Sequence, residues 1–276
     1  MNIEEKLKNM KPSDTPLLWL GYTLLGMMLL LSLPAKANDN EINIEQTGDN
    51  FTITVEQKGK NNLITGLTTT DALITGADNV LNIQQGYKGN NTLNLYLNGP
   101  DNYIKLMQER GTGYDTNSYG HHEASINVSG SYNTVEIVQR NNNDSSAGHS
   151  SNVRLVNGYN NIIKTLQTGT GGTNGHLSWV YTHNGESNNT VDIFQNSDTA
   201  DHVSYVSLYT DGNTVDINQT GTSQNNAYVL FSGNSTGPID FTLNQNGGNT
   251  YGNPNTTYVS QVCYNAGGCT VSVTQN

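Results

Sequence analysis

The chain has 276 residues and a formal net charge of −11, with 23 acidic and 12 basic residues. This acidity argues against nucleic-acid binding, which needs a basic stripe, and against docking on an anionic membrane surface. Apolar residues make up only 34% and charged residues only 13% of the chain, which disfavours both an ordinary globular core and a charge-rich disordered chain. The polar material is rich in Asn, Gln, Thr, Ser and Gly, and this composition favours hydrogen-bonded ladders in a repetitive β-structure.

An apolar run at residues 17–33 follows several lysines, and an Ala-Lys-Ala motif ends at Ala37. This pattern predicts a helical signal peptide over residues 1–37, cleaved after Ala37. The mature chain, residues 38–276, would then have no stable insertion in a membrane. The alternative is an uncleaved membrane anchor, because the run is near the lower length limit for a spanning helix.

A pattern of the form Gly-x-x-Asn-x-apolar-x-apolar-x-Gln recurs along the mature chain. It begins at Gly76, Gly99, Gly130 and Gly158, and in the last of these copies Thr165 takes the second apolar position. The core Asn-x-apolar-x-apolar-x-Gln also occurs, without the same glycine spacing, at Asn40, Asn189 and Asn213. Self-similarity of this kind predicts a stack of similar units rather than a single globular core.

The copy at residues 213–219 shows how one unit is built. Alternation places Asn213, Val215, Ile217 and Gln219 on one face and the polar residues between them on the other. The copy is therefore predicted to be a β-strand with β-branched residues inside. A second apolar stretch follows at residues 227–231, so one unit reads as strand, arc, strand and turn.

We therefore predict that residues 38–276 form an all-β solenoid of about nine two-strand coils with variable loops. Each strand would pair with its counterpart in the next coil, about 4.8 Å along the axis. The Gly-, Asn- and Ser-rich segments 111–122, 141–151 and 169–175 are expected to project as loops.

The recurring amides are the candidate functional residues. A buried Asn or Gln costs roughly 1–3 kcal/mol when it is unpaired, but identical amides stacked in register can bond to each other. We expect these ladders to carry self-assembly, because an end coil leaves its last rung open to another copy. The predicted ladder residues are Asn79, Asn102, Asn133, Asn161, Asn189 and Asn213, with Gln46, Gln57, Gln85, Gln108, Gln139, Gln167, Gln195 and Gln219.

The chain has two cysteines, Cys263 and Cys269. An even, close pair in an exported protein predicts a disulfide, and the alternative is two reduced thiols near the C-terminus. Their spacing does not suit a zinc knuckle, and no nearby ligand completes a metal site. We therefore expect no metal.

Other residues that could carry chemistry give weak signals. The histidines fall in or beside the loop segments and are expected to be solvated, with a weak metal-binding row as the alternative. They are His121, His122, His149, His176, His183 and His202. The outward acids are expected to form a column that keeps the chain soluble. They are Glu45, Glu56, Glu136, Asp192 and Asp216.

Enzyme activity is not expected. The acids have no repeated basic or histidine partner, so a polysaccharide lyase or hydrolase is the least favoured reading. Nucleotide-binding and calcium β-roll motifs are absent from the sequence, and we expect no cofactor.

The repeats resemble those of curlins, the subunits of curli, which are the amyloid fibres of bacterial biofilms. The curlin form Asn/Ser-x-apolar-x-apolar-x-Gln-x-Gly-x-x-Asn is reproduced closely from Asn40 to Gly59. A half-copy runs from Asn213 to Gly221. The resemblance covers most of residues 38–276, although weakly in the long loops.

The resemblance implies secretion through an outer-membrane pore and nucleated polymerisation at the surface of a Gram-negative bacterium. The implied partners are further copies of the chain and a nucleator subunit. Two departures from the curlin pattern leave open whether the role is major subunit, nucleator or accessory. Asn40 follows the cleavage site without a Gly/Asn-rich leader, and the second strand of most units lacks the Gln of the curlin repeat. The alternative function is a monomeric surface β-solenoid adhesin that binds a glycan, ice or a host surface.

Overall fold

The structure is a computed structural model whose described strands all belong to the compact unit Ala37–Asn276. The predicted signal peptide, most of each predicted loop segment, His121 and His183 lie outside the described residues. In the part of the chain that is described, no helix has the length and apolar character needed to cross a bilayer. The described residues are 41–58, 62–66, 71–86, 91–109, 122–141, 149–169, 176–182, 188–196, 202–209, 212–221, 225–235, 238–247, 256–263 and 269–275.

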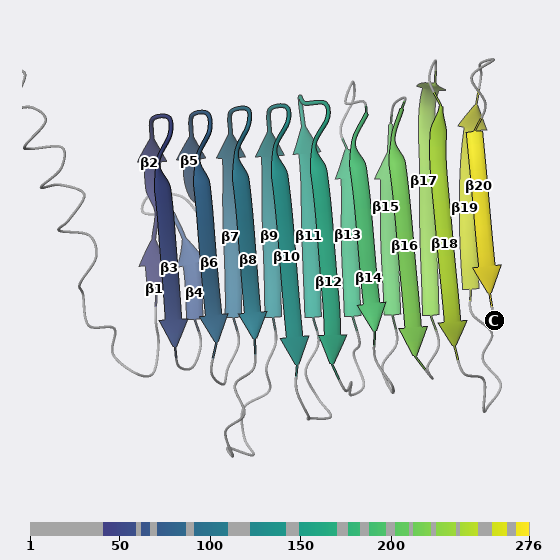
Figure 1. The fold of residues 1–276 in the computed structure, drawn as a ribbon, viewed down its shortest axis with the longest axis horizontal. Helices are drawn as coiled ribbons and strands as arrows, with labels where there is room; N and C mark the ends of the chain where they lie inside the picture. The colour runs from purple at the N-terminus through teal and green to yellow at the C-terminus, as the bar shows by residue number, and fades with distance from the viewer. Residues whose placement is uncertain are drawn as a thin grey trace, which may run out of the picture. The chain divides into compact units, whose positions relative to one another are not determined.

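The described residues form two parallel β-sheets, here called the first and second sheets (Figure 1). The first sheet has 11 strands. They are β1 (Glu41–Asn43), β2 (Glu45–Thr47), β4 (Asn62–Thr65), β5 (Ala72–Thr75), β7 (Asn91–Asn98), β9 (His122–Ser129), β11 (His149–Val156), β13 (His176–Thr182), β15 (His202–Leu208), β17 (Asn225–Ser235) and β19 (Thr256–Cys263).

The second sheet has 9 strands in the order β3-β6-β8-β10-β12-β14-β16-β18-β20. They are β3 (Thr52–Lys58), β6 (Val80–Gly86), β8 (Tyr103–Glu109), β10 (Thr134–Asn141), β12 (Ile162–Gly169), β14 (Thr190–Asn196), β16 (Thr214–Gly221), β18 (Ile239–Gly247) and β20 (Cys269–Gln275).

The chain alternates between the sheets, so a first-sheet strand and the second-sheet strand that follows it make one rung. The described strands pair only with strands of neighbouring rungs, and equivalent repeat positions face each other: Val135 lies opposite Ile104 on one side and Ile163 on the other. In the first two rungs the first-sheet strand is divided into β1 with β2 and β4 with β5. The prediction of an all-β parallel solenoid is confirmed.

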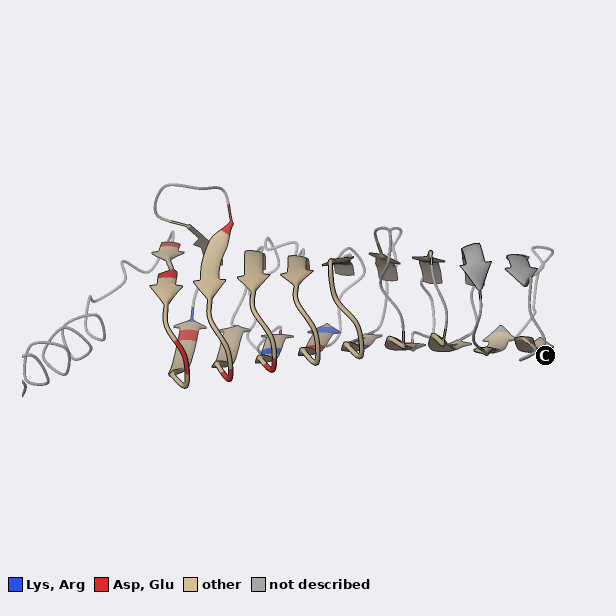
Figure 2. Cartoon of the chain, turned by 90° about the horizontal axis from the view of Figure 1, so that it is seen from above, with Lys and Arg blue, Asp and Glu red and all other residues tan. Residues whose placement is uncertain are grey.

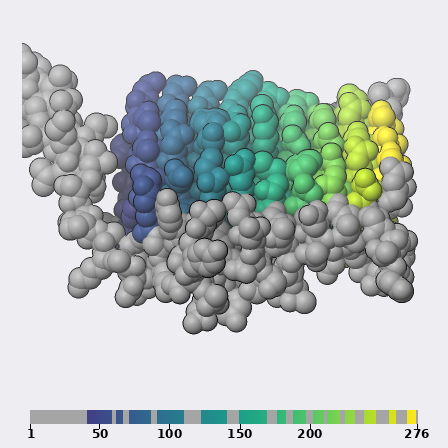
Figure 3. Space-filling model, turned by 60° about the horizontal axis from the view of Figure 1, so that its bottom comes forward, coloured from purple at the N-terminus to yellow at the C-terminus, as the bar shows by residue number. Residues whose placement is uncertain are grey.

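The core lies between the two sheets and continues from rung to rung. The alternate residues that face inward are apolar, as in Leu81, Ile104 and Val191, each 0% exposed. Such residues suit a pleated, buried surface, and their burial supplies the main apolar driving force for the fold. Figure 3 shows the rungs as contiguous bands in contact along the stack.

A tight turn joins β5 to β6, β7 to β8, β9 to β10 and β11 to β12, and the Gly-x-x-Asn part of the repeat forms it. Gly76 and Gly99 have φ of 133° and 137°, a region that disfavours residues with a Cβ atom. A Cβ on Gly99 would also collide with the backbone oxygen of Gly76, because the turns nest on one another. The Gly99 N–H donates to Ser129 O of the next rung at 2.8 Å, so the turns belong to the stack. Close approach therefore requires the repeated glycine at all four turns, and conformation also requires it at Gly76, Gly99 and Gly130.

Candidate functional site

The inward glutamines of the second sheet form a continuous ladder. Each glutamine donates a hydrogen bond from Nε2 to Oε1 of the glutamine one rung earlier, at 2.8–2.9 Å throughout. The series runs through Gln57, Gln85, Gln108, Gln139, Gln167, Gln195, Gln219 and Gln245. All eight side chains are 0–3% exposed. The ladder therefore has a direction, with donors pointing toward the N-terminal rung.

Each amide also ties the second sheet to the first. Gln139 Nε2 donates to His122 O at 3.2 Å and to Ser150 O at 2.9 Å, both on first-sheet strands. Gln108 makes the same pair of contacts one rung earlier, with Asn91 O at 3.1 Å and Glu123 O at 3.0 Å. A buried amide is costly unless its groups are bonded, and here both neighbouring glutamines and the facing backbone satisfy it.

The asparagines at the turn form a second ladder of opposite direction. The backbone N–H of one asparagine donates to Oδ1 of the asparagine in the next rung, at 2.9–3.0 Å. The series runs through Asn79, Asn102, Asn133, Asn161, Asn189 and Asn213. In the first rung the position belongs to Phe51, whose N–H donates to Asn79 Oδ1 at 3.2 Å. Each asparagine thus fixes the turn of the preceding rung.

Gln46 was expected in the glutamine ladder, and this expectation was wrong. Gln46 lies on β2 of the first sheet, where its register partner is Ile74. Its amide donates only a long bond of 3.5 Å to Thr47 O among the contacts described. The copy at Asn40 matches the others in sequence, but it is the first-sheet half of its rung. Gln57 takes the second-sheet position instead.

A third buried column was not expected, because the histidines were predicted to be solvated. Four histidines of the first sheet are only 0–3% exposed: His122, His149, His176 and His202. They lie in register on consecutive strands, with ring centroids 4.8–5.2 Å apart. Amides continue the column at both ends, through Asn62 and Asn91 before the histidines and Asn225 after them. The prediction of solvated loop histidines was wrong for these four residues.

Burial controls the charge state of the column. Burial, and then the charge of His202, lower the pKa of His176 to about 3. Burial also lowers the pKa of His202 to about 4, against a hydrogen bond with Asn225 that acts in the opposite direction. Both imidazoles are therefore neutral in the folded chain at neutral pH. At the N-terminal end of the column, Asn91 Nδ2 lies 3.0 Å from His122 Nδ1.

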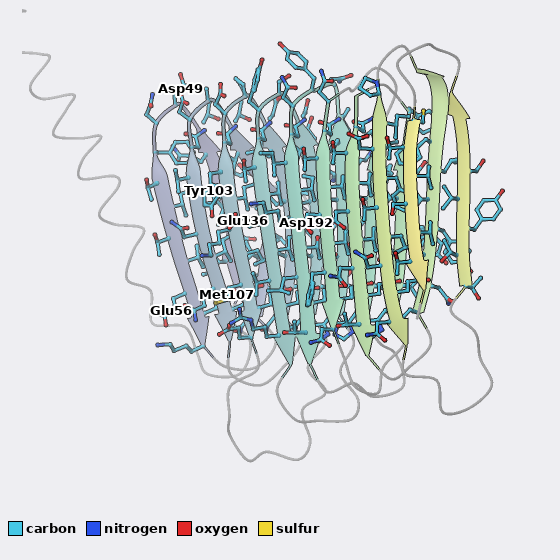
Figure 4. All side chains as sticks on the ribbon, turned by 45° about the vertical axis from the view of Figure 1, so that its right-hand side comes forward. Asp49, Glu56, Tyr103, Met107, Glu136 and Asp192 are labelled. Atoms are coloured by element: carbon cyan, nitrogen blue, oxygen red, sulfur yellow. The ribbon has the colours of Figure 1, made fainter. Side chains whose placement is uncertain are left out.

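The predicted column of outward acids is partly wrong. Glu136, Asp192 and Asp216 do share a column of the second sheet, and Figure 4 labels the first two. Glu56 belongs instead to a neighbouring column, opposite Gln84, and Glu45 lies on the first sheet opposite Leu73. Lysines alternate with the acids, as Lys164 Nζ lies 3.8 Å from Glu136. Among the described residues, no cluster of three His, Cys, Asp or Glu side chains could hold a metal ion.

The outer face of the first sheet changes character along the stack. Strands β13, β15, β17 and β19 contain no Asp, Glu, Lys or Arg, whereas acidic residues mark the N-terminal rungs (Figure 2). Trp179 stacks on Tyr205 with centroids 4.1 Å apart, and Tyr205 stacks on Tyr228 at 4.8 Å. The result is an uncharged aromatic face in the C-terminal half of the sheet.

The C-terminal rung is open. Val271 and Val273 of β20 are 44% and 42% exposed, although their register partners Phe241 and Leu243 are buried. Cys269, at the start of this strand, is disulfide-bonded, and the only other cysteine in the sequence is Cys263. Among the described residues, the last rung thus presents core-type residues that no other strand covers.

One family model matches a short segment of the chain. Residues 37–65 match the family model described as Curlin associated repeat. No curated protein and no solved structure matches the chain. The matched segment holds β1 to β4, which are the first rung and the start of the second. The resemblance to the curlin repeat is confirmed, and with the parallel β-solenoid it is consistent with a curlin-family protein.

Proposed function

We propose that the chain is a structural subunit of curli-like amyloid fibres that assembles by end-to-end stacking of its solenoid. The observation that carries this proposal is the open C-terminal rung. Val271 and Val273 occupy core positions yet remain about half exposed, whereas a monomeric solenoid normally covers such positions with a polar cap. A further rung on β20 would bury them.

The N-terminal rung offers the matching surface. Strands β3 and β20 are the two edges of the second sheet, so each has one side without a strand partner among the described residues. In a head-to-tail junction β20 of one copy would pair in parallel with β3 of the next. Gln275 pairs with Gln245, and Gln57 is the first member of the glutamine ladder, so a junction in this register would continue the ladder. The ladder's single direction fits such an arrangement, because every junction is then alike.

The wider role follows from the family match rather than from the geometry. The matched repeat belongs to a structural family, and no catalytic family is indicated. We propose that the chain is secreted from a Gram-negative bacterium through an outer-membrane pore and that it assembles in the biofilm matrix at the cell surface. Its partners would be copies of itself and a nucleator subunit. The predicted signal peptide with cleavage after Ala37 is part of this proposal.

A charge substitution in the end rung tests the assembly step. V271K/V273K places two ammonium groups on the inward face of β20, where a new rung would have to bury them unpaired. The matched control is T270K/S272K, which adds the same charge to the same strand at outward positions. In this proposal V271K/V273K abolishes seeded fibre growth measured by thioflavin fluorescence and electron microscopy, while T270K/S272K elongates at a rate close to wild type.

Both variants must first be shown to be folded, by their far-ultraviolet circular dichroism. Normal growth of V271K/V273K on wild-type seeds would refute stacking at this rung. If neither variant elongates, the loss of fibre growth comes from the added charge and not from the inward positions of the end rung. That result would also count against the proposal.

One observation favours a second function. The uncharged aromatic face with Trp179, Tyr205 and Tyr228 is the kind of surface with which a monomeric adhesin could bind a neutral glycan or a host surface. The rings stack face to face on one another, however, which leaves mainly their edges for a ligand. A W179S/Y205S variant that loses retention on immobilised neutral polysaccharide, in a chain that forms no fibres, would establish this alternative.

A further inference from the structure

The turn that joins the two strands of an interior rung is held from two directions. Within the rung, Asn102 Nδ2 donates to Gly99 O at 3.1 Å, and this bond closes the turn. From the next rung, Asn133 Oδ1 accepts a hydrogen bond from the Asn102 N–H at 2.9 Å. The second contact always comes from the rung on the C-terminal side. The described residues contain no rung after β19 and β20, so the series of such contacts ends there.

One cysteine of the last rung stands at the turn-asparagine position. Cys269 lies opposite Ile239 in register. Ile239 in turn occupies the same column as Asn213, because the residues that follow them, Asp240 and Thr214, pair with each other. The column of turn asparagines therefore ends at Cys269.

The other cysteine stands at the position of the turn glycine. Gln261 and Leu97 belong to one register column of the first sheet. Cys263 comes two residues after Gln261, just as Gly99 comes two residues after Leu97. Cys269 is disulfide-bonded, and Cys263 is the only other cysteine in the sequence. The disulfide thus joins the two repeat positions that the amide bond to Gly99 O joins in an interior rung.

Two other rungs have a different residue at the turn-asparagine position, and each is held by a neighbour instead. In the rung of β17 and β18 the residue is Ile239, and both strands pair with a rung on each side. In the first rung the residue is Phe51, whose N–H donates to Asn79 Oδ1 of the second rung. Among the described strands, β19 and β20 have neighbours on one side only. The disulfide therefore lies in the rung that has neither a turn asparagine nor a described later rung.

We propose that the disulfide between Cys263 and Cys269 replaces the contacts of a following rung and holds β20 in register as a template for the next copy of the chain. The templating step rests on the head-to-tail assembly proposed above. Val271 and Val273 of β20 are 44% and 42% exposed, so little apolar contact holds this strand against the stack. Such a strand opens locally more easily than an interior one. A covalent link at its first residue limits the conformations of the opened rung and favours the paired one.

Hydrogen exchange of the monomer tests whether the disulfide holds the end rung. In C263S/C269S the amides of β20 that bond to β18 should exchange about 30-fold faster than in wild type, the lower end of what a disulfide contributes. Amides of the interior strand β14 should change by less than threefold. Mass spectrometry of peptides from each strand gives both values, under conditions where light scattering shows a monomer.

Seeded growth tests whether the held rung serves as a template. C263S/C269S should elongate wild-type seeds at least about threefold more slowly than wild type, because only the fraction of chains with an ordered β20 can form the junction. The control is V191A, which removes buried methyl groups from β14 and so lowers the stability of an interior rung. V191A should elongate at a rate close to wild type, since it leaves the end rung intact.

Each possible result bears on one part of the proposal. Exchange of β20 within threefold of wild type in C263S/C269S would overturn it. Faster exchange with unchanged elongation would also overturn it, because the end rung would then template the next copy without the disulfide. If wild type forms no fibres at all, the proposed function fails, and the exchange comparison still decides whether the disulfide holds the end rung.

A second measurement covers a serine variant that does not fold. Dithiothreitol added to the folded wild-type monomer breaks the S–S bond to two thiols and is itself oxidised to a cyclic disulfide. The same acceleration of β20 exchange is expected in the reduced chain. A reduced chain whose β20 exchanges as slowly as in the oxidised chain would contradict the proposal.

Discussion

Replacement of one ladder glutamine by leucine measures what the ladder contributes to stability. Gln85 donates to Gln57 Oε1 at 2.9 Å and to Thr92 O at 3.2 Å, and it accepts from Gln108 Nε2 at 2.9 Å. Gln85 Nε2 also donates a longer bond of 3.4 Å to Asn62 O, and Q85L removes all four bonds in a fully buried site. At about 1 kcal/mol for each hydrogen bond lost, the four bonds amount to about 4 kcal/mol. The added apolar burial offsets about 1 kcal/mol, so the expected net loss is about 3 kcal/mol.

The neighbouring residue supplies the control. Gln84 is exposed on the outer face of the same strand, so Q84L should change the free energy of unfolding by no more than about 0.5 kcal/mol. Urea unfolding of the full chain gives both values. The double variant Q85L/Q108L should cost less than the sum of its single variants, because the bond between the two amides is lost only once. A Q85L chain that folds with wild-type stability would refute the view that the ladder is energetically important.

Two further predictions concern the turns and the outer face. G99A should destabilise the fold by about 2 kcal/mol more than G48A, as measured by urea unfolding. The two glycines have similar φ values, 137° and 138°, but a Cβ on Gly48 would have nothing within 4 Å, whereas a Cβ on Gly99 would meet the Gly76 backbone. Burial, and then the charge of Asp192, raise the pKa of Asp216. A raised folded pKa means that the carboxylate costs stability as pH rises through that pKa, so the gain of D216N over wild type should grow from acid toward neutral pH. A gain that shrinks with rising pH would contradict the assignment.

Much of the fold follows from alternation in the sequence. Asn79, Leu81, Ile83 and Gln85 sit at every second position, and each faces inward as a period of two requires. The repeated Gly-x-x-Asn spacing likewise indicates the turn, because Gly99 must adopt a positive φ next to an identical turn. Local pattern and stacking point to the same structure in these copies.

The two main errors have different physical causes, and the first is that the two sheets use similar local patterns. The copy ending at Gln46 reads like the others, but only the pairing between rungs shows that it lies on the first sheet. The histidine column was missed because histidine is usually solvated, whereas here it stacks on its own copies. A signal was present, since Asn91 and His122 stand at the same distance before the turn glycines Gly99 and Gly130.

The axial repeat of the fibre tests the account most directly. If each copy keeps its solenoid and stacks head to tail, the nine strands of the second sheet at about 4.8 Å each give a rise of about 43 Å per subunit. Helical reconstruction by electron cryomicroscopy should show that rise, with β20 of one copy parallel to β3 of the next. A rise of about 4.8 Å per subunit, in which every chain lies flat in one layer, would contradict the account.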